Sequence, residues 1–255
     1  MSVVKRAAIV TGGGTGMGAA TARLLVQRGW SVTIFGRRKD KLDEVLRDID
    51  QDINTLAVPG DVSNREDVQL LIDAHLEKFG RLDGLVNNAA IVVGGPIGDV
   101  SLEDWKKVMA VNVDGVFNMI NLSIEHLKKV KGSIVNVSSV SGVRGEWAFS
   151  PYCASKGAVT NFTHSLALEL GGQGVRINAV APALTDTDMA SFVTGSEEMM
   201  AMMRNRMPLG RAAKPSEIAA PIVFLLSDDA SFINGAILPV DGGVMASSGQ
   251  PNFTG

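Results

Sequence analysis

Short apolar runs rich in β-branched residues recur along the chain, separated by longer segments in which apolar residues return every three or four positions. The runs are nearly continuous in apolar character, which is typical of strands covered on both faces. The longer segments, such as 19–29 and 64–80, have the periodicity of amphipathic helices. The predicted strands are 7–10, 32–35, 55–58, 84–87, 133–137, 176–180 and 236–240.

This alternation of strand and helix predicts an α/β fold: a doubly wound, mostly parallel seven-stranded sheet of the Rossmann type, with helices on both faces. Ser63 is the expected N-cap of the helix that follows it. No linker, repeat or low-complexity segment divides the 255 residues. We therefore expect a single domain over 1–255, with a polar tail at 244–255 that is either loosely held or docked on a neighbouring subunit.

Composition narrows the function classes. Apolar residues make up 45% and charged residues 20% of the chain, and the net charge of −3 favours neither nucleic acid nor an anionic membrane as a partner. No apolar run approaches the roughly 20 residues of a membrane span. Cys153 is the single cysteine, which suits a cytoplasmic location, and three scattered histidines predict no metal site. The composition indicates a soluble, cytoplasmic protein without a metal site.

The first strand runs into a glycine-rich turn, TGGGTGMG, followed by a helix. Gly14, Gly16 and Ala19 fit the pattern G-x-G-x-x-A, and Gly12, Gly16 and Gly18 fit the wider T-G-x-x-x-G-x-G. Such a turn lets the backbone approach a pyrophosphate, which then faces the helix N-terminus. The position between a strand and a helix favours dinucleotide binding over a plain tight turn.

The end of the second predicted strand indicates which dinucleotide. A site for NAD(H) usually has a carboxylate there, against the ribose 2′-hydroxyl. This chain has Gly36 followed by Arg37, Arg38 and Lys39, and the first acid is Asp40. Two guanidinium groups could bind a 2′-phosphate bidentately. The sequence therefore favours NADP(H), with NAD(H) as the alternative.

A candidate catalytic group follows the fifth predicted strand. Tyr152 and Lys156 are one helical turn apart, and Ser138 and Ser139 stand at the end of the strand before them. A serine hydroxyl could bind a carbonyl oxygen while the tyrosine moves its proton, and a neighbouring ammonium would lower the tyrosine pKa. Taken alone, a tyrosine and a lysine at this spacing are more often an ordinary surface pair than a catalytic one.

In combination, the motifs resemble those of the short-chain dehydrogenase/reductase family, which has an extended Rossmann fold. The resemblance runs from about residue 6 to 243. It comprises TGGGTGMG, GDV at 60–62, NNAA at 87–90, VNVDGVF at 111–117, VNVSSVSG, YCASK, RINAVAPALTDT and GAILPVDGG.

The resemblance implies a role for each catalytic residue. Tyr152 would be the acid or base, Ser139 would orient the substrate oxygen, and Lys156 would also hold the nicotinamide ribose. Asn112, which the sequence by itself places in mid-helix, would fix a water that relays protons.

The resemblance also implies cofactor contacts. Asp61 and Val62 would contact the adenine, Asn88 and Ala89 the adenosine ribose, and the segment after Pro182 the nicotinamide. The full predicted set is Gly12, Thr15, Gly16, Met17, Gly18, Arg37, Arg38, Asp61, Val62, Asn88, Ala89, Tyr152, Lys156, Pro182, Thr185 and Thr187.

The substrate-covering segment is expected at 183–210. Ala183 departs from the family pattern and could narrow the pocket, whereas Ala90, a second departure, adds one methyl group. Five methionines within 199–207 fit either a helix packed on its own body or a neighbouring subunit, or a mobile lid over an apolar ketone. The predicted pocket residues are Glu146, Trp147, Phe149, Ala183, Met189 and Met199.

Together these features predict an NADP(H)-dependent oxidoreductase, most simply a ketone reductase. The alternatives are an NAD(H)-dependent secondary alcohol dehydrogenase and a nucleotide-binding regulator that has lost catalysis. The family resemblance implies a homo-oligomer, a tetramer or a dimer.

Overall fold

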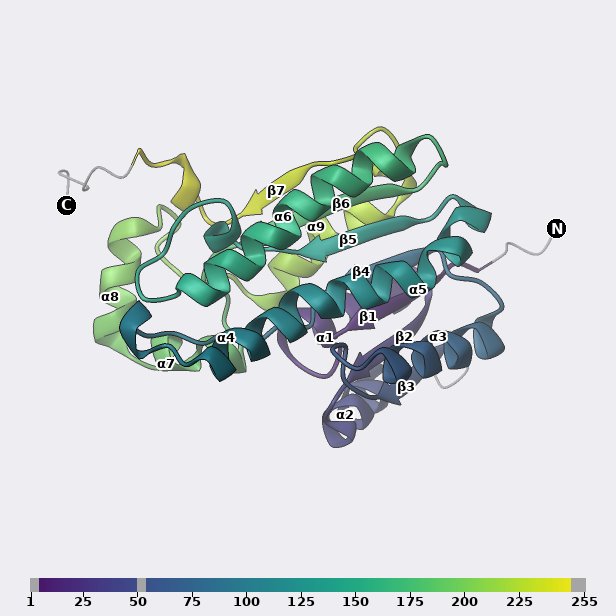
Figure 1. The fold of residues 1–255 in the computed structure, drawn as a ribbon, viewed down its shortest axis with the longest axis horizontal. Coiled ribbons are helices and arrows are strands. Elements are labelled where there is room, and N and C mark those ends of the chain that lie inside the picture. The colour runs from purple at the N-terminus through teal and green to yellow at the C-terminus, as the bar shows by residue number, and fades with distance from the viewer. Residues whose placement is uncertain (1–4, 50–53, 249–255) are drawn as a thin grey trace.

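A computed structural model describes residues 5–49 and 54–248, and within them a seven-stranded parallel sheet forms the centre of the molecule (Figure 1). The strand order is β3-β2-β1-β4-β5-β6-β7, and every neighbouring pair is parallel. The strands are β1 (Ala7–Thr11), β2 (Ser31–Gly36), β3 (Thr55–Pro59), β4 (Gly84–Asn87), β5 (Ser133–Val137), β6 (Arg176–Pro182) and β7 (Ile237–Val240). The predicted fold class is confirmed, and each predicted strand matches an observed one to within two residues at either end.

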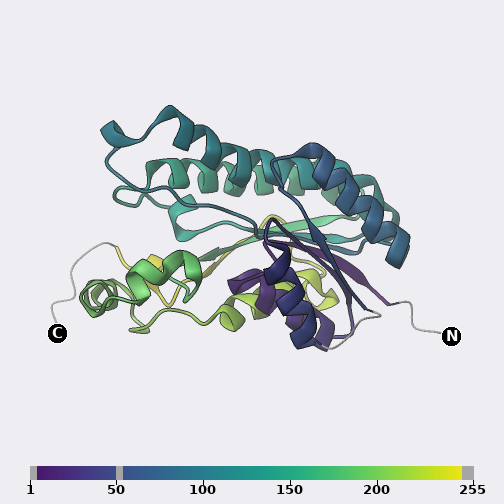
Figure 2. The same cartoon turned by 90° about the horizontal axis from the view of Figure 1, so that it is seen from below.

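Helices cover both faces of the sheet (Figure 2). One core joins the sheet to α1, α2 and α9, and a second core joins it to α3, α5 and α6. The helices are α1 (Gly16–Gln27), α2 (Lys39–Ile49), α3 (Arg65–Phe79), α4 (Leu102–Met109), α5 (Gly115–Val130), α6 (Ser150–Gly171), α7 (Ser191–Thr194), α8 (Glu197–Arg206) and α9 (Pro215–Leu226). Burial on both faces explains why the strand sequences are apolar throughout rather than alternating.

The sheet order places a ligand crevice. The chain runs outward from β1 to β3 in one direction and from β4 to β7 in the other, so the order reverses between β1 and β4. Ligands of such sheets bind beyond the carboxyl ends of the strands at this reversal. The arrowheads of the strands in Figure 1 point toward the end of the molecule that carries α4, α7 and α8.

The predicted cap of α3 is wrong by one residue. The Asn64 side chain accepts hydrogen bonds from the backbone N–H groups of Glu66 and Asp67, whereas the Ser63 hydroxyl donates to Asp61. The Ser63 hydroxyl is therefore bonded to Asp61 and does not cap the helix. Asparagine is an equally good N-cap residue.

Three further expectations concern the C-terminal tail, membrane spans and metal sites. Val244–Ala246 forms a short 3₁₀ helix, so the predicted tail begins with ordered structure, and residues 249–255 lie outside the described part. Within 5–49 and 54–248, no helix is long and apolar enough to cross a membrane and no group of side chains could hold a metal ion.

Candidate functional site

The turn between β1 and α1 has the backbone conformation that its glycines permit. Gly12 and Gly16 have φ angles of 64° and 53°, which residues with a Cβ rarely adopt. A Cβ on Gly18 would lie 2.2 Å from the Gly12 carbonyl oxygen. The first turn of α1 therefore packs directly on the loop, with the helix N-terminus beside the cavity described next, as a pyrophosphate site requires.

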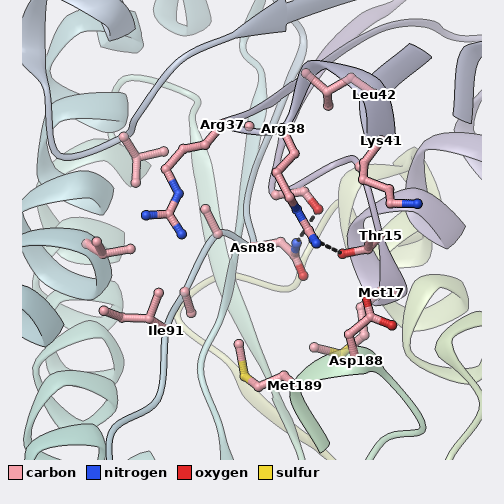
Figure 3. Close-up of a pocket in the computed structure, with 18 of the residues that line it drawn as sticks. Thr15, Met17, Arg37, Arg38, Lys41, Leu42, Asn88, Ile91, Asp188 and Met189 are labelled. Atoms are coloured by element: carbon pink, nitrogen blue, oxygen red, sulfur yellow. Dashed lines mark hydrogen bonds between the residues drawn. The ribbon is translucent and has the colours of Figure 1, made fainter. Parts of the chain in front are cut away.

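A cavity of about 250 Å³ opens at the carboxyl ends of β1 to β4 (Figure 3). Most of the predicted cofactor residues line it, together with one predicted pocket residue. These are Gly12, Thr15, Gly16, Met17, Arg37, Arg38, Asp61, Val62, Asn88, Ala89, Thr187 and Met189. Gly18, Pro182, Thr185, Tyr152 and Lys156 are not part of its lining.

Thr11 holds the two strands at the centre of this cavity together, and the sequence analysis missed it. Its hydroxyl accepts hydrogen bonds from the backbone N–H groups of Asn88 and Ala89, each at 3.0 Å. The Asn88 amide nitrogen donates to the Thr11 and Gly12 carbonyl oxygens at 2.9 and 3.3 Å. Asn88 therefore fixes the shape of the glycine-rich turn in addition to lining the cavity. The threonine that precedes the glycines was the available signal.

Both arginines after β2 line the cavity, and Figure 3 shows Arg38 reaching across to the glycine-rich turn. Arg38 Nη2 lies 3.4 Å from Thr15 Oγ1. Arg37 Nη1 lies 3.9 Å from a carboxylate oxygen of Asp61 at the end of β3. In dinucleotide-binding folds the residue at the end of the second strand recognises the adenosine ribose. The guanidinium groups of Arg37 and Arg38 lie directly after that strand and line the cavity.

Lys41, in the first turn of α2, is the third basic residue that lines the cavity. It is ion-paired with Glu44 at 2.8 Å, whereas Lys39 is ion-paired with Asp43 at 2.6 Å and does not line the cavity. Gly36 also lines the cavity, and the nearest atom to a Cβ built on it would be 3.8 Å away. The position where an NAD(H) site usually has a carboxylate therefore carries no side chain, and a Cβ there would be in ordinary van der Waals contact with Leu42.

Ser139 and Tyr152 meet as predicted. Ser139 follows β5, Tyr152 lies in the first turn of α6, and the Ser139 side chain is close enough to that of Tyr152 to lower the tyrosine pKa. Burial raises the pKa of Tyr152 to about 12, the Ser139 side chain opposes this, and the Glu146 charge adds to it. The expectation of a lowered tyrosine pKa is therefore wrong for this structure, because loss of hydration dominates.

Lys156 is buried beneath the tyrosine. Its Nζ donates to the Val137 carbonyl oxygen at 2.7 Å and lies 5.7 Å from the centroid of the Tyr152 ring. Burial lowers the pKa of Lys156 to about 8. The alternative of an ordinary surface pair is excluded, since the lysine side chain is 3% exposed.

Asn112 lies in a π-helical turn, Ala110–Asp114, between α4 and α5, and not in a regular helix as its sequence suggested. Its Oδ1 accepts from the Ile91 backbone N–H at 2.8 Å, and its Nδ2 donates to the Ile91 carbonyl and to Ser155 Oγ. Ser155 in turn donates to the Tyr152 carbonyl oxygen at 2.8 Å. Asn112 thus connects the segment after β4 to the helix that carries the tyrosine.

Of the six predicted pocket residues, only Met189 lines the cavity. Trp147 is 89% exposed, and Phe149 packs against the backbone at Gly94. Met199 lies on α8, which has no buried residue, so α8 does not pack a buried apolar face on the body of this chain. The remaining two are Ala183, which is partly buried after β6, and Glu146, which is exposed and hydrogen-bonded to Ser141.

Comparisons with known proteins agree with this geometry. A family model described as enoyl-(acyl carrier protein) reductase matches residues 12–245. The chain is 44% identical over 245 residues to meso-2,3-butanediol dehydrogenase of Serratia marcescens, with 96% of each chain covered. It is 38% identical to the NADP-dependent (R)-specific alcohol dehydrogenase of Lentilactobacillus kefiri, over 94% of this chain and 97% of that one. The crystal structure of levodione reductase superposes with a TM-score of 0.91 at 33% identity, over 95% of this chain and 98% of that one.

Proposed function

The chain belongs to the short-chain dehydrogenase/reductase family, and we propose that it transfers a hydride between NADP(H) and a ketone or secondary alcohol. One observation carries the proposal. The side chains of Ser139, Tyr152 and Lys156 lie near the carboxyl end of β5, and the basic cavity opens at the carboxyl ends of the neighbouring strands. The family relationship shows an oxidoreductase that acts on alcohols and ketones. The cofactor preference and the residue roles are part of the proposal.

The residues present fit a dinucleotide. The glycine-rich turn and the α1 N-terminus would hold the pyrophosphate, and the strand ends at Asp61 and Asn88 would hold the adenosine. When bound, the nicotinamide supplies or accepts the hydride.

The chain's own groups would handle the proton. Tyr152 keeps its proton at neutral pH because its pKa is raised, so it can donate to the oxygen of a ketone that is being reduced. Ser139 would bind the same oxygen. Lys156, whose pKa is near neutrality, would return a proton to Tyr152 after each turnover. These features support the direction of ketone reduction.

Arg37, Arg38 and Lys41 support NADP(H) as the cofactor. They line the cavity beside Gly36, where no carboxylate opposes a 2′-phosphate. Two contacts favour the alternative, NAD(H). Arg37 lies 3.9 Å from an Asp61 carboxylate oxygen and Lys41 lies 2.8 Å from one of Glu44, and each pair offsets part of the basic charge.

Titration of the protein with NADPH and with NADH, followed by nicotinamide fluorescence, tests the cofactor. Tighter binding of NADPH would support the proposal, and tighter binding of NADH would favour the dehydrogenase alternative. Binding of neither would overturn the role of the glycine-rich turn. A panel of ketones and alcohols should then include acetoin and 2,3-butanediol, because a relative 44% identical is named for that diol. Cofactor binding without turnover across the panel would revive a regulatory role.

We also propose that the chain is one domain that assembles into a homo-oligomer, a tetramer or a dimer. Phe117 on α5 and Leu168 on α6 are 48% and 87% exposed, and such apolar side chains are candidates for burial between subunits. Light scattering coupled to gel filtration would give the mass in solution. The cytoplasmic location stays a prediction.

A further inference from the structure

The cavity at the glycine-rich turn contains a carboxylate that has no part in the proposed function. Asp188 follows Thr187, begins the short 3₁₀ helix Asp188–Ala190 and lines the cavity. Its segment packs directly on the turn, because a Cβ built on Gly16 would lie 2.9 Å from Thr187 Cγ2. In Figure 3 the Asp188 side chain lies on the same side of the cavity as Thr15 and Met17, where α1 begins.

The Asp188 carboxylate has no cation to offset its charge. Within residues 5–49 and 54–248 it forms neither an ion pair nor a hydrogen bond, and the nearby Ser191 hydroxyl donates instead to the Asp188 backbone carbonyl oxygen at 2.8 Å. The other acid that lines the cavity, Asp61, differs in this respect, because one of its carboxylate oxygens lies 3.9 Å from Arg37 Nη1. Asp188 therefore contributes a full negative charge to its side of the cavity.

A negative charge at this place opposes the group that the glycine-rich turn is suited to hold. The backbone N–H groups of the turn and the N-terminus of α1 attract a pyrophosphate. A carboxylate on the same side of the cavity repels it, by an energy that falls with distance and with screening by water and salt. Because Asp188 is exposed, the repulsion should weaken binding without preventing it.

We propose that Asp188 opposes the pyrophosphate of the bound dinucleotide and so lowers the affinity of the site for NADP(H) and NAD(H) equally. The inference rests on the proposed function in taking the cavity as the dinucleotide site. It assigns Asp188 a role different from that of Arg38, since the arginine would act on the 2′-phosphate that distinguishes the two cofactors and Asp188 on the group they share. A hydride-transfer enzyme exchanges its cofactor in every turnover, and a weaker site favours that exchange.

The decisive variant is Asp188→Asn, which keeps the shape of the side chain and removes its charge. We expect the dissociation constants for NADPH and for NADH each to fall by about three- to tenfold, the size of effect expected for like charges several ångströms apart at a hydrated surface. A nicotinamide fluorescence titration measures both constants without substrate or turnover. Circular dichroism would verify that the variant is folded like its parent.

Asp186→Asn is the matched control, because it removes an exposed carboxylate two residues earlier in the same segment, and Asp186 does not line the cavity. It should leave both dissociation constants within about twofold of the parent values. Repeating the titrations in 1 M NaCl, where charges are screened beyond about 3 Å, should shrink the difference between Asp188→Asn and the parent. An effect of side-chain shape would persist in salt.

The outcomes separate this inference from the proposed function. If the parent binds a dinucleotide and Asp188→Asn binds it no more tightly, only the inference fails. Tighter binding of NADPH alone would also overturn it, since the charge would then act on the 2′-phosphate, as would an equal gain from Asp186→Asn. If the parent binds neither cofactor, the inference and the proposed function fail together. If the titrations behave as expected and the protein reduces no ketone, only the proposed reaction fails.

Discussion

The Lys156 ammonium lies 5.7 Å from the ring of Tyr152 but gives a hydrogen bond to the Val137 carbonyl oxygen, at 2.7 Å. The lysine is therefore buried by the packing of α6 on β5, and its charge is only partly compensated. Burial moves the pKa values of the two residues in opposite directions, to about 8 for the lysine and about 12 for the tyrosine. In unfolded peptides tyrosine and lysine have nearly equal pKa values, so burial separates the two values here.

Lys156→Met should stabilise the folded protein at neutral pH while removing activity. The unfolded lysine binds its proton up to a pKa of 10.5 and the folded one only up to about 8, so the folded state is penalised below pH 8 and recovers as the pH rises to 10.5. The gain at neutral pH should be on the order of 3 kcal/mol. Urea unfolding of both proteins at neutral pH and near pH 10 would show the gain shrinking at the higher pH. A variant less stable than its parent at both pH values would contradict this account.

Tyr152→Phe should abolish turnover without preventing cofactor binding. The change removes one hydroxyl, and loss of a positioned proton donor typically costs about 10²- to 10⁴-fold in rate. The ring still fills the same volume, and Tyr152 does not line the cofactor cavity. Steady-state kinetics and a nicotinamide fluorescence titration on the same preparation would separate the two effects. Near-normal kcat would remove Tyr152 from the proposed chemistry.

Arg38→Ala should weaken NADPH binding while changing NADH binding little. A charge-assisted hydrogen bond contributes about 1.5 to 3 kcal/mol, which corresponds to roughly 10- to 150-fold in the dissociation constant. Lys39→Ala is the control, because Lys39 is paired with Asp43 and does not line the cavity. Equal weakening of both cofactors by Arg38→Ala would mean that the guanidinium does not recognise the 2′-phosphate.

Asn112→Ala should destabilise the protein as well as reduce its activity. The change leaves the Ile91 N–H and C=O groups without the partner they have now, and an unsatisfied buried group costs about 1 to 3 kcal/mol. Ser155→Ala removes only one of the contacts of Asn112 and should cost less. Thermal unfolding of both variants would rank them. A larger loss for Ser155→Ala would show that the tie to Ile91 is not the important one.

The sequence by itself determined the architecture and the main chemical groups. Strands buried on both faces must be apolar throughout, so the seven runs are visible without a structure. The turn between β1 and α1 needs glycine for its positive φ angles and its close backbone packing, and those requirements also show in the sequence. The one-turn spacing of Tyr152 and Lys156 depends only on helix geometry.

The tertiary structure decided which way side chains face and what surrounds them. Lys41 rather than Lys39 lines the cavity, the Asn112 side chain bonds to Ile91, and Glu146 reaches Ser141. The pKa of Tyr152 rises instead of falling because its sign depends on the balance between burial and neighbouring charge. Local sequence cannot fix these features, since each depends on how segments far apart in the chain, or the two ends of one loop, pack together around the end of the sheet.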